Sequence, residues 1–256
     1  MSASHIGMLA SSFRRSPPGP PSFSNVKLLM HMEGQLGTQT YKDRSSHNRS
    51  IVGSSAALLD NTFVYRGLSS LNITSGVNLN VPVDPAIGNT EWARMGTNTH
   101  PLTAEIAFCM TSSNVGALFG APQLTGGAFN WLSVILNISA LSHKVTVAFG
   151  TVSADVPLLT TPSSGAFHML AIQITGTTSH IVGVWLDGVW QGSVNMGDTI
   201  ITYTGPFGVG DEGLNISRLA GANQYLGWFD EFRISEEVFL PWATNYTPRT
   251  GPFPNY

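Results

Sequence analysis

The stretch Gly227-Trp228-Phe229-Asp230-Glu231-Phe232-Arg233-Ile234 decides the fold class, because it has the pattern of a single β-strand. Two carboxylates and an arginine lie inside an otherwise apolar, aromatic-rich run. Successive side chains of a strand point to opposite faces. The alternation therefore predicts one face with Trp228, Asp230, Phe232 and Ile234, and an opposite face with Phe229, Glu231 and Arg233.

Asp230 is the unusual member of this strand, since the alternation puts its carboxylate on the more apolar face. A buried carboxylate without a partner is costly. Asp230 therefore needs a turn of backbone amides, a cation or a metal ion as its partner. The sequence leaves these three alternatives open.

This strand resembles the closing strand of laminin-G-like, concanavalin-A-type jelly rolls, which is commonly spelt G-φ-φ-D-E-φ-R-φ, where φ is apolar. Four further segments resemble the same family in the same order, over roughly residues 25 to 240. They are an opening strand that ends in an acidic residue and glycine (Asn25 to Gly34), a D-x-S element (Tyr41 to Ser46), a W-H-x-φ-A-φ strand with Phe for Trp (Gly165 to Ile172), and a φ-x-φ-D-G hairpin (Val184 to Trp190).

The resemblance implies an all-β fold, namely an antiparallel jelly-roll β-sandwich of the concanavalin A type. Its first and last strands would be neighbours, which would bring Lys27, His31 and Glu33 near Glu231 and Arg233. Such mixed charges suit cross-strand pairs.

The composition of the chain agrees with one large β-domain. Of 256 residues, 42% are hydrophobic, which is ample for a core, and the 27 glycines and 15 prolines fit short strands joined by turns. Charged residues are only 11%, and the net charge of −3 gives no basic footprint, so we expect no nucleic-acid partner. No apolar run approaches the ~20 residues of a membrane span. Membrane insertion is therefore not expected either.

The cysteine content and the first ten residues indicate whether the chain has the features of a secreted protein. Cys109 is the only cysteine, so the chain has no intrachain disulfide, and its apolar surroundings predict a buried small hydrophobe. Residues 1–10 lack the basic start and apolar core of a signal peptide, so we expect no secretion signal there.

Turn signals recur between short apolar segments, which predicts one antiparallel domain over residues 25–240. The clearest hairpin turn is Asp187-Gly188, because both positions tolerate the positive φ of a type I′ loop. A short helical turn is expected at Ser235 to Leu240, where Pro241 stops it.

Residues 1–24 are predicted to form an extended N-terminal arm, and residues 241–256 an extended C-terminal tail. Prolines cannot donate to a sheet ladder and favour polyproline extension. The N-terminal segment is either a disordered tail or an arm that lies along a neighbouring subunit. In the second reading its anchoring residues are Pro17, Pro18, Pro20 and Pro21.

The resemblance also implies a metal hypothesis. Family members often hold a structural Ca²⁺ through an aspartate after the first strand and the aspartate of the closing strand. The matching residues are Asp43 and Asp230, whereas Arg44 and Arg49 nearby oppose a divalent ion. The alternative is that Asp43 caps a turn and that Asp230 pairs with arginine or backbone amides.

Glycan binding is the next hypothesis, because sugars are often held by an aromatic platform with nearby amide and carboxylate groups. The candidate residues are Trp92, in a polar loop from Val83 to His100, together with Trp185 and Trp190, which flank the Asp187-Gly188 turn. The alternative for each tryptophan is packing in the core.

No catalytic residue is predicted. Glucanases of this superfamily carry a Glu-x-Asp-x-x-Glu strand, and that spacing is absent here. Two carboxylates at a fixed separation are what glycoside hydrolysis requires. The seven histidines show no metal-ligand spacing, and His168 takes the structural position of the W-H strand.

The resemblance extends to laminin-G-like modules of tailed-bacteriophage structural proteins. It implies a non-enzymatic virion component, either a capsid decoration protein or a fibre or tail adhesin. Such a protein would be made in the host cytoplasm and displayed on the virion surface. Its partners would be other virion proteins, further copies of itself and cell-surface glycans. The alternatives are a free carbohydrate-binding lectin module and, further off, a divergent glycan hydrolase.

Overall fold

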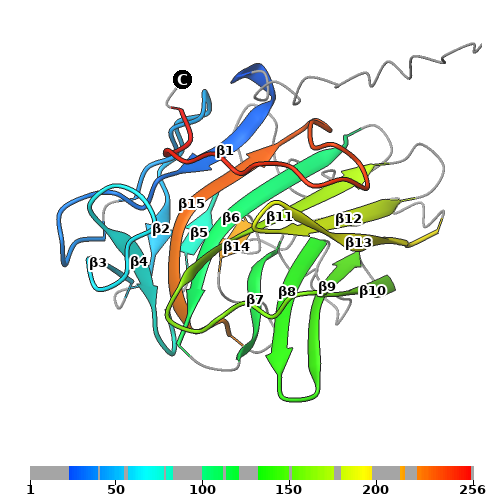
Figure 1. The fold of residues 1–256 in the computed structure, drawn as a ribbon. Helices are drawn as coiled ribbons and strands as arrows, with labels where there is room; N and C mark the ends of the chain where they lie inside the picture. Colours follow the sequence, from blue (N-terminus) through cyan, green and yellow to red (C-terminus); the bar gives the residue numbers. More distant parts are fainter. Residues whose placement is uncertain are drawn as a thin grey trace, which may run out of the picture.

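The computed structural model describes residues 23–39, 41–54, 57–77, 79–82, 100–111, 114–120, 132–149, 152–175, 180–197, 214–216 and 224–254. Across these ranges the strands form two antiparallel sheets, and the one helical element is the short 3-10 turn Phe23–Asn25 (Figure 1). The predicted all-β sandwich is confirmed. Within the same ranges, no helix is long and apolar enough to cross a bilayer.

The first sheet has eight strands and contains both ends of the domain. Strand β15 lies in its middle and pairs with β6 on one side. On its other side β15 pairs first with β4 and then with β1, so the predicted pairing of the first and last strands is confirmed. The strands, in order across the sheet, are β13 (Val189–Asn195), β12 (Ile181–Leu186), β11 (Phe167–Thr175), β6 (Leu102–Met110), β15 (Gly227–Ser235), β4 (Ser70–Ile73) and β3 (Leu58–Asp60), with β1 (Val26–Met30) beside β15.

The second sheet has seven strands and packs against the inner face of the first. Phe119 of β7 and Phe232 of β15 meet across the interface, with ring centroids 5.1 Å apart. One buried cluster joins the two sheets and forms the core. In order, the strands are β10 (Val152–Pro157), β9 (Ser142–Phe149), β8 (Leu132–Ser139), β7 (Asn114–Gly120), β14 (Leu214–Ile216), β5 (Leu79–Val81) and β2 (Val52–Gly53).

A β-bulge corrects the predicted alternation of β15. Phe229 pairs with Phe108 and Phe232 pairs with Ile106, so β15 has one more residue than β6 between these two pairs. An extra residue in one strand reverses the sheet face to which each preceding side chain of that strand points. As a result Phe229 joins Phe232 and Ile234 in the core, and the prediction that Trp228 shares their face is wrong.

Two smaller predictions have different outcomes. The Asp187-Gly188 hairpin is confirmed, with φ values of 52° and 77°. The helical turn at Ser235 to Leu240 is wrong, because Ser235 is the last residue of β15 and the chain continues in bends. Residues 1–22 of the predicted N-terminal arm, with Pro17, Pro18, Pro20 and Pro21, lie outside the described residues, so the anchoring role stays a prediction.

Candidate binding surface

Residues 236–254, which we call the strap, run across the outer face of the eight-stranded sheet (Figure 1). Leu240 packs on Ala171 and Trp185. Phe253, only 4% exposed, joins a second outer cluster with Leu29, Ala107 and Met169 of β1, β6 and β11. The predicted extended C-terminal tail therefore packs on its own domain, because it carries apolar side chains that cover this face.

Backbone groups of the strap are bound by polar side chains of the sheet. The Oε1 atom of Gln173 accepts hydrogen bonds from the N–H groups of Phe239 (3.1 Å) and Leu240 (2.8 Å). The Oε2 atom of Glu231 accepts the N–H of Phe253 at 2.8 Å. These buried acceptors fix where the strap lies.

Charged groups under the strap are paired. His31 Nδ1 lies 2.9 Å from Glu231 Oε1, as the first-to-last pairing predicts. Arg233, however, donates from Nε to Glu105 Oε2 of β6 at 2.8 Å, and Lys27 pairs with Glu236 at 3.1 Å. The guanidinium of Arg233 also lies over the rings of Phe253 and Phe239, at 4.2 and 5.1 Å from their centroids.

The carboxylate of Asp230 is bound by a turn of backbone amides, one of the three partners left open. Its Oδ2 accepts the N–H groups of Tyr65 and Arg66, each at 2.9 Å, and its Oδ1 accepts the N–H of Glu231 at 2.9 Å. Burial raises the pKa of Asp230 to about 7, while the three N–H donors act in the opposite direction.

Asp43 is held in the same way. Its Oδ1 accepts the N–H groups of Leu29 (3.1 Å) and Ser45 (2.9 Å), and its Oδ2 accepts a guanidinium N–H of Arg49 at 2.8 Å. Ca²⁺ requires six to eight oxygen ligands. Because N–H donors face the oxygens of Asp43 and Asp230, the residues present do not fit the ion, and the described ranges contain no cluster of three or more His, Cys, Asp or Glu that could hold a metal.

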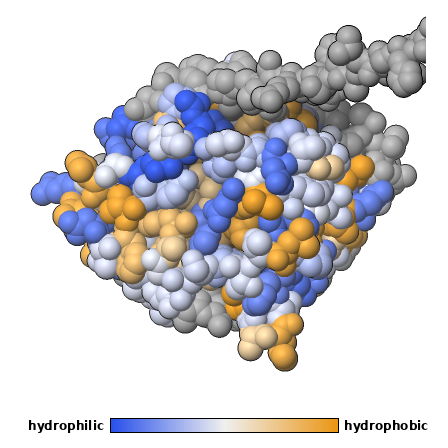
Figure 2. All heavy atoms as spheres, in the orientation of Figure 1, coloured by the Kyte–Doolittle hydropathy of each residue, from blue (hydrophilic) through white to orange (hydrophobic). Residues whose placement is uncertain are grey.

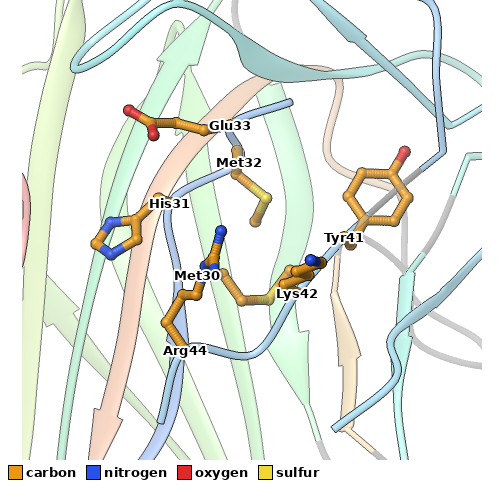
Figure 3. Close-up of a pocket in the computed structure, with 7 residues that line it drawn as sticks. All are labelled: Met30, His31, Met32, Glu33, Tyr41, Lys42 and Arg44. Carbon is orange, nitrogen blue, oxygen red and sulfur yellow. The ribbon is translucent and has the colours of Figure 1, made fainter. Parts of the chain in front are cut away.

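A small pocket lies beside the end of β1, where Met32 takes a left-handed φ of 49°. Figure 3 shows His31, Met32 and Glu33 along the end of this strand, with Lys42 and Arg44 on the segment that returns beside it. The volume of about 40 Å³ has room for one or a few water molecules. It is too small for a sugar ring.

The predicted tryptophan platform is corrected in part. Trp92 lies outside the described residues. Trp185 is fully buried under the strap, and its Nε1 donates to Thr244 O at 2.8 Å, so it offers no surface to a ligand. Trp190 is half-buried and packs against Trp242 of the strap, with ring centroids 5.4 Å apart.

Trp190 and Trp242, which we call the tryptophan pair, share a floor at Gly183. A Cβ atom there would lie 2.9 Å from ring atoms of both residues, so only glycine lets the two rings approach this strand. Trp242 is 37% exposed. The pairing was missed at the sequence level, because only the docking of the strap brings Trp242 to a hairpin some fifty residues away in the chain.

His168 lies between a carboxylate and a serine. Its Nδ1 is 2.7 Å from Asp187 Oδ2, which raises the pKa of His168, and its Nε2 is 3.1 Å from Ser163 Oγ. This order resembles a Ser-His-Asp triad. The N–H of Ser163 also donates to Nε2 at 2.9 Å and so occupies the lone pair that a general base would use. The ring therefore ties the turn after Thr160 to the β12–β13 hairpin.

Comparison with known proteins gives a fold and no family. No family model and no curated protein sequence matches the chain. Among solved structures, the receptor-binding domain of botulinum neurotoxin D matches with a TM-score of 0.55 and 8% identity, over 84% of this chain and 50% of that one. The domain of the C/D mosaic serotype gives a TM-score of 0.57 and 10% identity, over 84% and 49%.

A third structure is matched over nearly its whole length. Domain 4 of AbnA, a GH43 extracellular arabinanase from Geobacillus stearothermophilus solved with arabinotriose, gives a TM-score of 0.52 and 13% identity, over 85% of this chain and 96% of that one. The chain thus spans about half the length of the matched toxin domains and nearly all of domain 4. At these identities the likeness establishes the fold. The chain is a β-sandwich domain of the jelly-roll type.

Proposed function

We propose that this chain is a non-enzymatic glycan-binding module displayed on a bacteriophage particle, as a capsid decoration protein or as a fibre or tail adhesin. The observation that carries the glycan part is the tryptophan pair. Its exposed indole can stack on the apolar face of a sugar, and amide groups beside it can bind hydroxyls. Asn245 lies next to the pair, where its Oδ1 accepts the N–H of Trp190 at 2.9 Å.

Two further observations support a binding role. The matched structures include a receptor-binding domain of a botulinum neurotoxin and an arabinanase domain in complex with arabinotriose. If the chain were a glycan hydrolase, Glu231 would be the first candidate for its catalytic carboxylate. Glu231 is 1% exposed, and it is bound by His31 and by the N–H of Phe253. A buried carboxylate that is already paired has no route to a glycosidic bond.

Glycan binding is tested with the purified full chain on a glycan array, followed by titration of the glycans that bind. Trp242→Ala should weaken binding at least tenfold, because it removes the exposed ring. Leu141→Ala is the matched control, since Leu141 is 98% exposed at the tip of the β8–β9 hairpin. Equal affinity of the two variants would remove the tryptophan pair from the proposal, and no binding by the wild-type chain would remove glycan recognition.

The virion part rests on the sequence resemblance and on the predicted N-terminal arm. Antibody raised to the sandwich and detected by immunogold should label purified particles. Label over the head would indicate a decoration protein, and label at the tail tip or fibres would indicate an adhesin. Unlabelled particles would instead favour the free lectin module, and unchanged incorporation after deletion of residues 1–24 would contradict the anchoring role.

A further inference from the structure

We propose a second ligand site on this domain, specific for a small neutral saccharide, in a groove at the β3–β4 end of the eight-stranded sheet. The ligand class deepens the proposed glycan-binding function and rests on it, whereas the site is separate from the tryptophan pair. The groove has a volume of about 380 Å³. Small-ligand sites occupy roughly 300–1,000 Å³, so this one suits a ligand of one or a few sugar rings.

The walls of this groove, which we call the edge groove, are held in place by backbone hydrogen bonds. Its floor is the outer side of β3 and β4, and one wall is the loop that carries Leu36 and Gly37. The N–H of Gly37 donates to Leu59 O at 2.9 Å, and the N–H of Leu59 donates to Thr38 O at 3.2 Å. The loop therefore extends the edge of the sheet, and the groove is formed before any ligand arrives.

The carboxylate of Asp60 holds one polar group of the groove, the amide of Asn72, in place. Strand register sets Leu58, Asn72 and Trp228 in one row across the sheet. Asp60 accepts the Nδ2 donor of Asn72 at 2.6 Å and the Nε1 donor of Trp228 at 3.1 Å. Because Nδ2 is turned to Asp60, the carbonyl oxygen of the Asn72 amide is left to receive a ligand hydroxyl.

The chemistry of the lining selects the ligand. Leu36 and Leu58 are 48% and 39% exposed, and they lie beside the polar side chains of Asn61 and Thr74. Figure 2 shows hydrophobic residues mixed with hydrophilic ones at the left of the view, where β3 and β4 lie in Figure 1. An apolar strip beside amides and a hydroxyl matches the C–H face and hydroxyl rim of a sugar.

The charge of the groove disfavours acidic ligands. Among the eight described residues that line the groove, Asp60 is the one that carries a charge, and none of the eight is a lysine or arginine. A carboxylated, sulfated or phosphorylated ligand would meet the carboxylate of Asp60 with no cation to balance it. The groove therefore favours neutral sugars over acidic ones.

The test titrates the full chain with a panel of neutral oligosaccharides of glucose, galactose and arabinose, and with sialyllactose as the acidic probe, by saturation-transfer NMR and calorimetry. Asn61→Ala and Asn72→Ala should each weaken neutral-sugar binding in the groove at least fivefold. Asn61 is exposed, so its variant tests the site even where Asn72→Ala unfolds the β3–β4 edge. The matched control is Leu141→Ala, 98% exposed at the tip of the β8–β9 hairpin and outside both proposed sites.

The outcomes separate the two proposals. Binding that is lost in the Asn61 variant and kept in Trp242→Ala supports the groove. Binding that is lost only in Trp242→Ala overturns the groove and leaves the proposed function standing. Preference for sialyllactose in the groove overturns its neutral specificity, and absence of any sugar binding overturns both.

Discussion

The backbone N–H of Phe253 donates a 2.8 Å hydrogen bond to Oε2 of Glu231, which ties the C-terminal strap to the strand that closes the sheet. Glu231 also binds His31 of the opening strand, and the ring of Phe253 lies 4.2 Å from the guanidinium of Arg233. Three chain segments therefore meet at one buried carboxylate. The strap therefore packs as part of the folded domain.

The first prediction concerns the docking of the strap. Phe253→Ala should lower the free energy of unfolding by about 3 kcal/mol, the cost of truncating a buried aromatic side chain. Urea unfolding is the measurement, with Leu141→Ala, 98% exposed, as the control that should change stability by less than about 0.5 kcal/mol. Equal stability of the two variants would mean that the strap is not docked in solution.

The second prediction concerns the ion pair beneath the strap. Glu105 and Arg233 are 5% and 3% exposed, so removing one partner leaves the other charge buried without compensation. Glu105→Gln and Arg233→Met should each cost about 3 kcal/mol or more, and the double variant should cost clearly less than their sum. The double-mutant cycle is read from unfolding curves, and strict additivity would show that the two charges are not coupled.

Much of the fold follows from local sequence patterns. The jelly-roll class and the pairing of the first and last strands follow from the resemblance of the strand motifs to the laminin-G-like family, and the Asp187-Gly188 turn follows from its dipeptide. The need of Asp230 for a partner is also predictable, because burial of a carboxylate carries its own penalty. These features involve residues that lie close in sequence, or motifs that follow one another in the order common to the family that the chain resembles.

The remaining features depend on contacts without a local signature. The bulge at Asp230 and Glu231 inserts one residue opposite β6, and no residue type demands it. Trp185 is buried under the strap, where it donates a hydrogen bond to Thr244, 59 residues away in the chain. Its position beside a hairpin turn therefore led to the incorrect prediction that its ring is exposed. The edge groove brings Leu36, Asn61 and Asn72 together only through strand register.

The third prediction concerns pH. The pKa of Asp230 is raised from 3.8 to about 7 in the folded state, so between these values the folded chain holds a proton that the unfolded chain has lost. Stability should therefore fall as pH rises from about 4 to about 7, and the contribution should be constant above that window. Urea unfolding from pH 4 to pH 8 measures this slope.

Asp230→Asn is the control for that slope. Its amide group faces the N–H of Glu231, so the variant should be less stable at every pH. The difference in stability between the two proteins should nevertheless shrink as pH rises through the window, because only the wild-type chain loses stability there through this group. A constant difference would contradict the raised pKa.

The fourth prediction concerns calcium. N–H donors face the oxygens of Asp43, and Arg49 pairs with it at 2.8 Å, so EDTA or added Ca²⁺ should shift the melting temperature by less than about 1 °C. Differential scanning fluorimetry measures the shift. A rise of several degrees with Ca²⁺ that Asp43→Asn removes would restore the calcium hypothesis.

The fifth prediction separates the two tryptophans that the strap brings together. Trp185→Phe should lower the free energy of unfolding by about 2 kcal/mol, because it removes the 2.8 Å hydrogen bond to Thr244 and leaves space under the strap. Trp242→Ala, at a side chain that is 37% exposed, should change stability much less and glycan affinity much more. Paired unfolding and glycan titrations measure both effects. If Trp185→Phe abolished glycan binding at unchanged stability, Trp185 would contact the ligand, and its assignment as a buried support for the strap would be wrong.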